Sequence, residues 1–551
     1  MITTNIINLS QPSAYPTLVK QHLEAMAPKS GQALKAAQNL FFDAAAQLLN
    51  KPEGLEALYH HAHLFDESKV FAGGPWREPA DLQIALVAGS LRGPGITPVV
   101  ETLSELRMLA IATGKAPQAS IPSAAACQFL DEVIARNLRY LFPTGGQTQE
   151  ERSGEDRYRE SHQRLMSLIV AERGLEPVLR EVASEAEQIL AQRPIITVHV
   201  RRMVERAWRL AQEKGIHTKD AKAIGHYLDA AHQPTPLTQK YGSLPDYRRA
   251  LQKAGAKVLA REAEAFGKSM MATGMVAPAH AVLVRQLLKS APDLLPKALA
   301  TDEAGSVEVE QNQELVHQCI AASVFPSTSQ CLYGLSQALN RTLFSRPEVA
   351  AGLDRLISLE VREDVAANLL ANRNEDEEVT AAGVLLAGAI AVLGQPLGIG
   401  QGLNPTCQSA RGMSLWAQHD PAHLLKLLVS GARDGRIQML FHGHLIRSDE
   451  LPVGVATTLD LDLDPVSIVL VPHLDRLYSE LMRRSALRLE DAHKWVNTAL
   501  YGRFVPYDLA TAFADIGQTT IADFTGFVRC FFATHHPEYN GGLRLMYPNP
   551  V

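Results

Sequence analysis

The strongest chemical signal in this sequence lies between residues 401 and 417, which read Gln-Gly-Leu-Asn-Pro-Thr-Cys-Gln-Ser-Ala-Arg-Gly-Met-Ser-Leu-Trp-Ala. An uncharged, Gly-rich approach ends at Cys407, and Cys407 opens a segment with the pattern of a helix. The first turn of a helix carries unpaired N–H groups and the positive end of the helix dipole, which favour a thiolate over a thiol. Glycines let the backbone pass close to a bound substrate. We therefore expect Cys407 to be a nucleophile.

A cysteine nucleophile needs a base, a group that orients the base, and donors for the oxyanion. His442 follows the short apolar run 436–441, and Asp460 closes the next run, 454–459. If these runs pair as neighbouring antiparallel strands, the two side chains lie side by side over the helix start. Gln401 and the backbone N–H of the cysteine would then donate to the oxyanion. The pattern predicts a Cys–His–Asp arrangement.

A second histidine is an alternative base. His473 follows the apolar run 466–471, which has the composition of a strand, and it precedes a helical pattern. Asp475, Asp491 or Asp508 could then orient the imidazole. The sequence leaves the choice between the two histidines open.

Each of these residues also has a structural interpretation. A Cys among Gly and Ala near an apolar helix is commonly a small buried side chain. A His at a strand end commonly makes a structural hydrogen bond. Asp460, Asp462 and Asp464 alternate with leucine, as one solvated strand face would. Histidines at 60–63 and 442–444 lack the Glu-x-x-His pattern of a metal site, so we expect no metal and no other cofactor.

A Cys at a helix start, followed by a His on one strand and an Asp on the next, resembles the papain-like and transglutaminase-like cysteine enzymes. The resemblance covers residues 394–464. The preceding Gln, the helix opening and the pair Trp416-Ala417 look papain-like, although Gln408 stands where papain-type motifs have an aromatic residue. The short intervals between Cys, His and Asp look transglutaminase-like.

The resemblance implies a protease or a transglutaminase/deamidase that acts on amide bonds of a protein or peptide substrate. The matching residues would be the nucleophile Cys407, the base His442, the orienting Asp460 and the oxyanion donor Gln401. The thiolate would attack a carbonyl, the histidine would protonate the departing amine or ammonia, and water or an amine would release the acyl group.

Length and composition favour a globular protein of several domains. The chain has 551 residues, of which 46% are apolar and 20% are charged. A net charge of −6 over that length gives no electrostatic case for nucleic-acid binding. The uncharged stretch 379–402 is strongly apolar only as far as residue 393, where Gly-Gln-Pro interrupts it. We expect a buried helix there and no stable membrane insertion.

The cysteines and the N-terminus bear on the compartment. Five scattered cysteines without a Cys-x-x-Cys pair favour a reducing, cytoplasmic location. The first ten residues lack the basic and apolar regions of a signal peptide, and their Ile/Thr/Asn/Ser bias resembles the export signals of bacterial type III effectors. Export without a cleavable signal peptide is therefore the alternative.

The patterns predict a mainly α-helical multidomain chain with a C-terminal α+β domain, in which a helix packs on a small antiparallel sheet. We expect helical domains at 1–142 and 157–300 and the α+β domain, which carries Cys407, at 314–551. An acidic connector is expected at 301–313, and strands at 436–441, 454–459 and 466–471. The helices with the clearest periodicity are expected at 32–49, 97–113, 124–141, 161–175, 176–192 and 196–214.

The competing hypothesis is a non-enzymatic, mostly helical binding or scaffold protein, including a secreted bacterial effector. Cys407 would then be packed and inert to alkylating reagents. The sequence carries no signal of oligomeric state.

Overall fold

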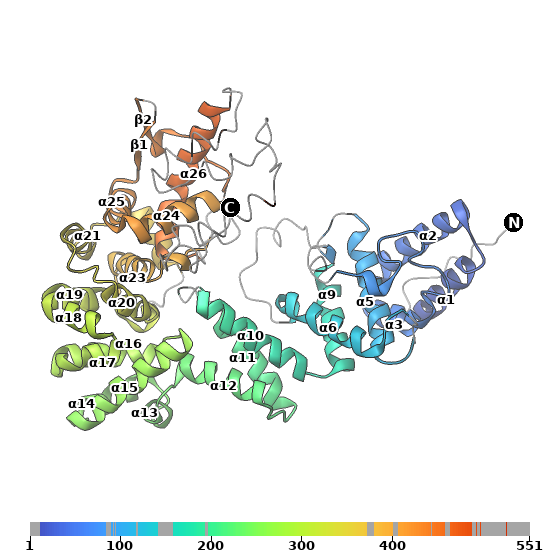
Figure 1. Cartoon of the computed structure of the whole chain (residues 1–551), viewed down its shortest axis with the longest axis horizontal. Helices are drawn as coiled ribbons and strands as arrows, with labels where there is room; N and C mark the ends of the chain where they lie inside the picture. Colours follow the sequence, from blue (N-terminus) through green and yellow to red (C-terminus); the bar gives the residue numbers. More distant parts are fainter. Residues whose placement is uncertain are drawn as a thin grey trace. The chain divides into compact units, whose positions relative to one another are not determined.

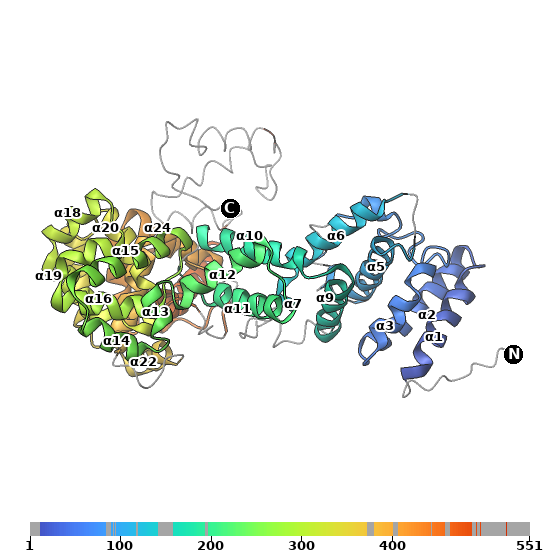
Figure 2. The ribbon, with the colours of Figure 1, turned by 90° about the horizontal axis from the view of Figure 1, so that it is seen from below.

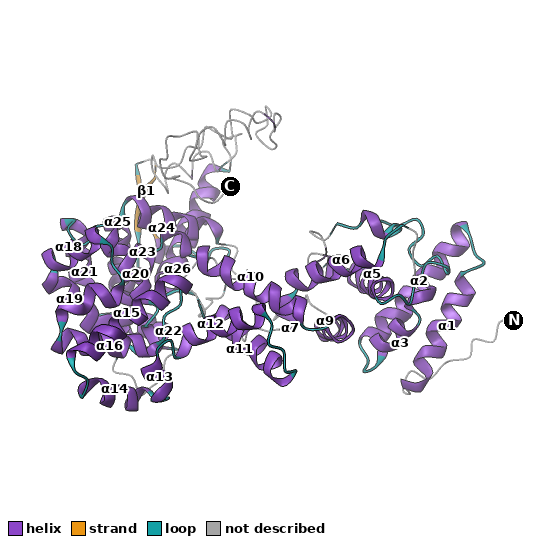
Figure 3. Cartoon of the chain, turned by 60° about the horizontal axis from the view of Figure 1, so that its bottom comes forward, coloured by secondary structure: helices purple, strands orange, loops and turns teal. Residues whose placement is uncertain are grey.

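The computed structural model describes residues 12–496 and residue 525, except 84–86, 88–89, 92, 94, 117–119, 142–157, 193–194, 196, 372–378, 401–405, 442, 458–462, 487–491 and 493–495. The described part of the chain is mainly α-helical, as predicted (Figure 1). Its one sheet is a two-stranded antiparallel hairpin near the C-terminus, which also agrees with the prediction (Figure 3). Among the described residues, no helix combines the length and the hydropathy that crossing a bilayer requires.

The chain divides into two compact units. Unit 1 comprises residues 1–186 and 202–226, and unit 2 comprises residues 187–201 and 227–551. The border falls within three helices, which are α10 (Glu176–Gln192), α11 (Val198–Glu213) and α12 (Lys219–His232). The three-domain division expected from the sequence stays a prediction.

Unit 1 is built around one buried helix, α5. The other helices that lie wholly in unit 1 are α1 (Tyr15–Met26), α2 (Gly31–Leu49), α3 (Gly54–His60), α6 (Ser123–Arg136), α7 (Leu138–Leu141) and α9 (Arg159–Arg173). Helices α1, α2 and α3 lie side by side (Figure 2). Helix α5 (Thr97–Ala112) packs against α2, α3, α6 and α9, and every residue from Pro98 to Ile111 is buried. The helix is where the sequence predicts it, but the expected amphipathic pattern is wrong, because α5 has no solvent-facing side.

Unit 2 holds the remaining elements. Its helices are α13 (Pro236–Lys240), α14 (Leu244–Gln252), α15 (Ala256–Thr273), α16 (Pro278–Ser290), α17 (Leu295–Leu299), α18 (Glu303–Gln311), α19 (Gln313–Ser323), α20 (Cys331–Asn340), α21 (Pro347–Ile357), α22 (Glu363–Leu370), α23 (Ala381–Gly394), α24 (Cys407–His419), α25 (Pro421–Val429) and α26 (Pro465–Ser485). Its strands are β1 (Gln438–Phe441) and β2 (His444–Arg447). The prediction of an acidic connector at 301–313 is therefore wrong, because most of this segment forms the helix α18.

The centre of unit 2 is the apolar helix α23, which confirms the prediction of a buried helix in this stretch. Thr380 caps its start by accepting a hydrogen bond from the N–H of Gly383 at 3.0 Å. All residues from Gly383 to Gly394 are buried, and α23 contacts α19, α20, α21, α22, α24 and α26. A helix that is apolar on every side needs such a complete cover.

Helices α20 and α23 approach each other so closely that glycine is required at the crossing. A Cβ on Gly394 would overlap with the backbone of Gly334, and a Cβ on Gly334 would overlap with the backbone of Ala391. Backbone atoms cannot move aside as a flexible side chain can. The packing of the whole unit therefore depends on these two small residues.

The predicted strands are partly right. Strand β1 lies within the predicted range 436–441, whereas its partner β2 was not predicted. The described part of the second range, 454–457, contains no strand, and residues 466–471 form the first turns of α26. The third prediction fails because Asp464 caps a helix and Pro465 occupies its first position, and an apolar run by itself does not distinguish a strand from a buried helix.

We expect Gly394→Ala to destabilise unit 2 by about 1–3 kcal/mol, because the added methyl overlaps with a backbone that has no room to shift. Urea unfolding followed by circular dichroism measures the change. Gly255→Ala is the matched control, since a Cβ there meets no atom within 4 Å. Equal stability of both variants and the wild type would contradict the tight crossing.

Candidate functional site

Cys407 is the first residue of α24, as predicted, and its side chain is exposed. The preceding Thr406 is buried, and its hydroxyl neither caps the helix nor finds another hydrogen-bond partner. Thr406 therefore does not cap α24 with its side chain. The first-turn N–H groups of a helix can stabilise a thiolate or an oxyanion.

The rest of α24 is held firmly. Its inner face, which includes Met413 and Trp416, packs against α23, α25, α26 and the turn Pro396–Gly398. The guanidinium of Arg341 donates to the carbonyls of Leu393, Ala417 and Gln418, so one side chain binds the C-terminal ends of both α23 and α24. The start of α24 is thus carried by a rigid element.

Cys407 is the exposed cysteine among the four that the structure describes. Cys319 and Cys331 are buried and Cys127 is half-buried. Burial raises the pKa of the Cys319 thiol to about 12, so this thiol is protonated at neutral pH. Exposure and position at a helix start therefore single out Cys407 as the candidate for thiol chemistry.

Three of the predicted partners, Gln401, His442 and Asp460, lie outside the described residues. Phe441 and His444 are paired across the hairpin, so the chain reverses direction between them. The strand beside β1 is therefore β2 rather than the predicted run at 454–459. The assignment of these three residues to the site stays a prediction, although the strand pairing on which it was based is not the one observed.

The alternative base, His473, lies inside α26 and not at the end of a strand. Its Nδ1 is 2.9 Å from the hydroxyl oxygen of Ser448, which also accepts a hydrogen bond from the N–H of Ile437 at 2.8 Å. The hydroxyl of Ser448 and Nδ1 of His473 share this hydrogen bond, and the tautomer of the imidazole determines which of the two donates. Burial, with smaller contributions from Arg476 and Arg362, lowers the pKa of His473 to about 4.

The geometry of His473 is that of a structural connection. Its side chain is only 9% exposed, and Ser448, which is fully buried, directly follows β2. The backbone N–H of Ser448 also donates to the carbonyl of Ile437 at 2.9 Å. This network attaches the base of the hairpin to α26.

The expected orienting groups of His473 lie elsewhere. Asp475 accepts a hydrogen bond from the N–H of Ala456 at 2.9 Å, and its carboxylate lies against Gly454. It therefore fixes the segment after the hairpin. Asp491 and Asp508 lie outside the described residues.

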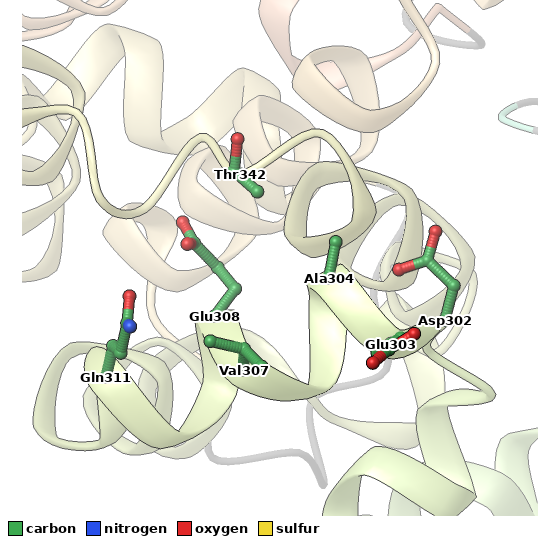
Figure 4. Close-up of a pocket in the computed structure, with 7 residues that line it drawn as sticks. All are labelled: Asp302, Glu303, Ala304, Val307, Glu308, Gln311 and Thr342. Carbon is green, nitrogen blue, oxygen red and sulfur yellow. The ribbon is translucent and has the colours of Figure 1, made fainter.

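An open groove of about 560 Å³ runs along α18, and the sequence analysis did not predict it (Figure 4). Two of its three acidic side chains, those of Asp302 and Glu308, have structural partners. Asp302 caps α18 by accepting from the N–H of Gly305 at 2.7 Å, and the Glu308 carboxylate accepts from the backbone N–H and the hydroxyl of Ser345, each at 2.6 Å. The lining residues are Asp302, Glu303, Ala304, Val307, Glu308, Gln311 and Thr342.

The outer face of the hairpin carries a pair of exposed leucines, which was not predicted from the sequence. Leu440 and Leu445 are directly paired across β1 and β2, and their exposed fractions are 68% and 54%. The opposite face, with Phe441 and Ile446, is buried. Alternation along a strand could have identified the two faces, had β2 been predicted.

No group of three or more His, Cys, Asp or Glu side chains in the described ranges has a geometry that could hold a metal ion. The rings of His60 and His61 have centroids 4.8 Å apart, and those of His61 and His63 have centroids 6.5 Å apart. The Nδ1 of His61 is 3.3 Å from the carbonyl of Ala57.

Comparison of the chain with protein-family models, curated proteins and solved structures finds no match. The resemblance to papain-like and transglutaminase-like enzymes therefore rests on the local sequence pattern and on the position of Cys407.

We expect the stability of unit 2 to fall as the pH is lowered from about 6.5 through about 4, because the unfolded chain binds a proton at residue 473 before the folded chain does. The loss from this histidine is at most about 1.4 kcal/mol per pH unit. His473→Gln, which can still form a hydrogen bond with Ser448 but does not titrate, should make the decline in urea unfolding less steep. His444→Gln, at an exposed position on β2, is the control and should keep the wild-type profile. A His473→Gln profile like that of the wild type would contradict the assignment.

Proposed function

We propose that the protein is a cysteine-dependent enzyme that acts on amide bonds, either a protease or a transglutaminase/deamidase, with Cys407 as its nucleophile. The observation that carries the proposal is an exposed thiol on the first residue of α24. A helix start in general favours the thiolate form of a cysteine, and the exposure of this thiol leaves it open to a substrate. The substrate is a protein or a peptide.

The reaction that fits these residues is acyl transfer through a thioester. The Cys407 sulfur forms a bond to the carbonyl carbon, and the N–H groups at the start of α24 stabilise the resulting oxyanion. The C–N bond then breaks as a histidine gives its proton to the departing amine or ammonia. Water or an amine displaces the sulfur and regenerates the thiol.

His442 is the base in this proposal, with Asp460 to orient it and Gln401 as an additional oxyanion donor. His473 is the less suitable base, because its Nδ1 is engaged by Ser448 and its low pKa makes it a weak proton acceptor at neutral pH.

We expect native Cys407 to react with iodoacetamide faster than Cys127 does at the same pH, because Cys407 is exposed and lies at a helix start. Mass spectrometry of the full-length protein, read cysteine by cysteine over a pH series, measures this. Cys127 in the same sample and Cys407 in the urea-unfolded chain are the references. A Cys407 that reacts only after unfolding, or a Cys407→Ala variant that keeps every activity, would refute the proposal.

Two histidine variants distinguish the bases. We expect His442→Asn to slow Cys407 alkylation towards the rate of the unfolded chain, and His473→Asn to leave the rate unchanged. An effect of His473→Asn without an effect of His442→Asn would indicate that His473 is the base.

The second candidate function is protein binding, and the exposed leucine pair of the hairpin favours it. Monomeric proteins rarely leave large apolar side chains directly paired in solvent, and such patches mark interaction surfaces. Val453 and Val455, which follow the hairpin in the sequence, are also exposed, at 58% and 57%. The protein would then be a mostly helical binding module that presents this surface.

We expect a double variant, Leu440→Ser with Leu445→Ser, to lose a binding partner without losing the fold, because both side chains are exposed. Affinity capture with the purified chain as bait, compared with Val307→Ser on α18, makes the measurement. Val307 is a suitable control because it is an exposed apolar residue, at 45%, in the same unit. Identical captured proteins from wild type and both variants would exclude the hairpin as the binding surface.

A further inference from the structure

Helix α5 carries charged side chains in the core of unit 1, which distinguishes it from the apolar α23. Residues in a position that has no solvent-facing side are normally apolar, because burying a polar group without a partner is unfavourable. The buried polar and charged residues of α5 are Glu101, Thr102, Ser104, Glu105 and Arg107.

Glu105 is the extreme case. Its exposed fraction is 0%, and apart from the neighbouring carboxyl of Glu101 its carboxyl oxygens have no hydrogen-bond partner among the described residues. Burial raises the pKa of Glu105 well above its usual range, and Glu101, one turn earlier on the same face of α5, raises it further. Both effects favour the protonated form of this carboxyl group.

The neighbouring arginine does not neutralise Glu105. The guanidinium of Arg107 donates to Asp66 at 3.2 Å and to the backbone carbonyls of Arg77 and Trp76, and it lies 4.1 Å above the ring of Phe71. Its hydrogen bonds are directed away from Glu105, although its charge still lowers the pKa of that carboxyl.

Glu101 has a different environment although it is also buried. Its Oε2 accepts a hydrogen bond from the indole N–H of Trp76 at 2.7 Å. Burial raises the pKa of Glu101, while this bond and the charge of Arg107 lower it. Of the two carboxyl groups, Glu105 is thus the one without compensation for a negative charge.

Among the described residues, the helices packed against α5 bring no further ion pair to Glu105. Asp43 on α2 and Glu56 on α3 are exposed, and Asp131 on α6 is bound by Arg173 and Arg180. From α9, His162 is buried next to the rings of Tyr140 and Tyr158. Asp66 and Glu78 act on Arg107 rather than on Glu105.

We propose that the carboxyl pair Glu101–Glu105 makes the packing of unit 1 depend on pH, so that loss of the Glu105 proton loosens the helices around α5. An ionised Glu105 would be a second negative charge one turn from Glu101, in a site from which water is excluded. Opening of the core to solvent would hydrate both carboxylates and reduce their repulsion. The device is independent of Cys407 and adds a pH-dependent transition to the part of the chain that lacks the candidate site.

The direction of the effect follows from proton binding. The folded state keeps the Glu105 proton to a higher pH than the unfolded chain, where an ordinary Glu has a pKa of about 4.5. The stabilisation is therefore complete below about pH 4.5 and is lost as the pH rises towards the folded-state pKa. Between these values the opening equilibrium changes by up to about tenfold per pH unit.

Hydrogen exchange of the full-length protein, read by mass spectrometry on peptides from α5, tests the proposal. After correction for the intrinsic pH dependence of exchange, the opening equilibrium constant of α5 should rise between pH 5 and pH 8. Glu105→Gln, which has the same shape but no ionisable group, should remove most of this rise and increase protection at pH 8.

Two further variants make the result unambiguous. Glu160→Gln, at an exposed position on α9 of the same unit, should keep the wild-type profile. Glu101→Gln, which can still accept from Trp76, removes the neighbouring charge that raises the pKa of Glu105, so the rise should end at a lower pH and be smaller than in the wild type. A flat wild-type profile, or a rise that persists unchanged in Glu105→Gln, would overturn the proposal, even if Glu101→Gln fails to fold.

Discussion

The contact between Gly334 and the last turns of α23 is the constraint on which unit 2 depends. Two helix backbones meet there with no side chain between them, which sets the distance between α20 and α23. The same principle applies at Gly388, where a Cβ would overlap with the ring of Pro465 at the start of α26. Because neighbouring helices are placed by these small residues, the position of α24, and with it that of Cys407, follows from the surface of one apolar helix.

The central helices of the two units, α5 and α23, are stabilised by different kinds of interaction. Helix α23 is made of small and aliphatic residues, so close packing alone satisfies it. Helix α5 instead buries charged groups and depends on specific partners such as Trp76 and Asp66. Buried polar networks of this kind are sensitive to a single missing partner, whereas apolar contacts fail gradually. Unit 1 is therefore the part whose stability is expected to respond most to solution conditions.

The elements that the sequence predicts correctly are those determined by neighbouring residues. The start of α24 at Cys407, the buried helix α23 and the strand β1 are each encoded in a continuous stretch of residues. The prediction failed at α26, where Asp464 and Pro465 are a clear helix start but the apolar run after them was taken for a strand. The acidic composition of α18 similarly concealed a capped helix.

The candidate site could be predicted only in part, for a physical reason. A helix start is a local property, but the partner of His473 is Ser448, a residue distant in sequence that is brought close by tertiary packing. No spacing rule predicts which hydroxyl will reach a buried imidazole. The buried carboxyl of Glu105 was missed for the same reason, because the helical pattern of α5 does not reveal that all of its sides are covered.

The attachment of the hairpin to α26 has a mechanical consequence. A two-stranded hairpin by itself is marginally stable in water, so β1 and β2 owe their order to the packed inner face and to the bond between Ser448 and His473. The hairpin and α26 are therefore connected at that bond. A displacement of α26 would move the base of the hairpin, and with it the exposed leucine pair on the outer face.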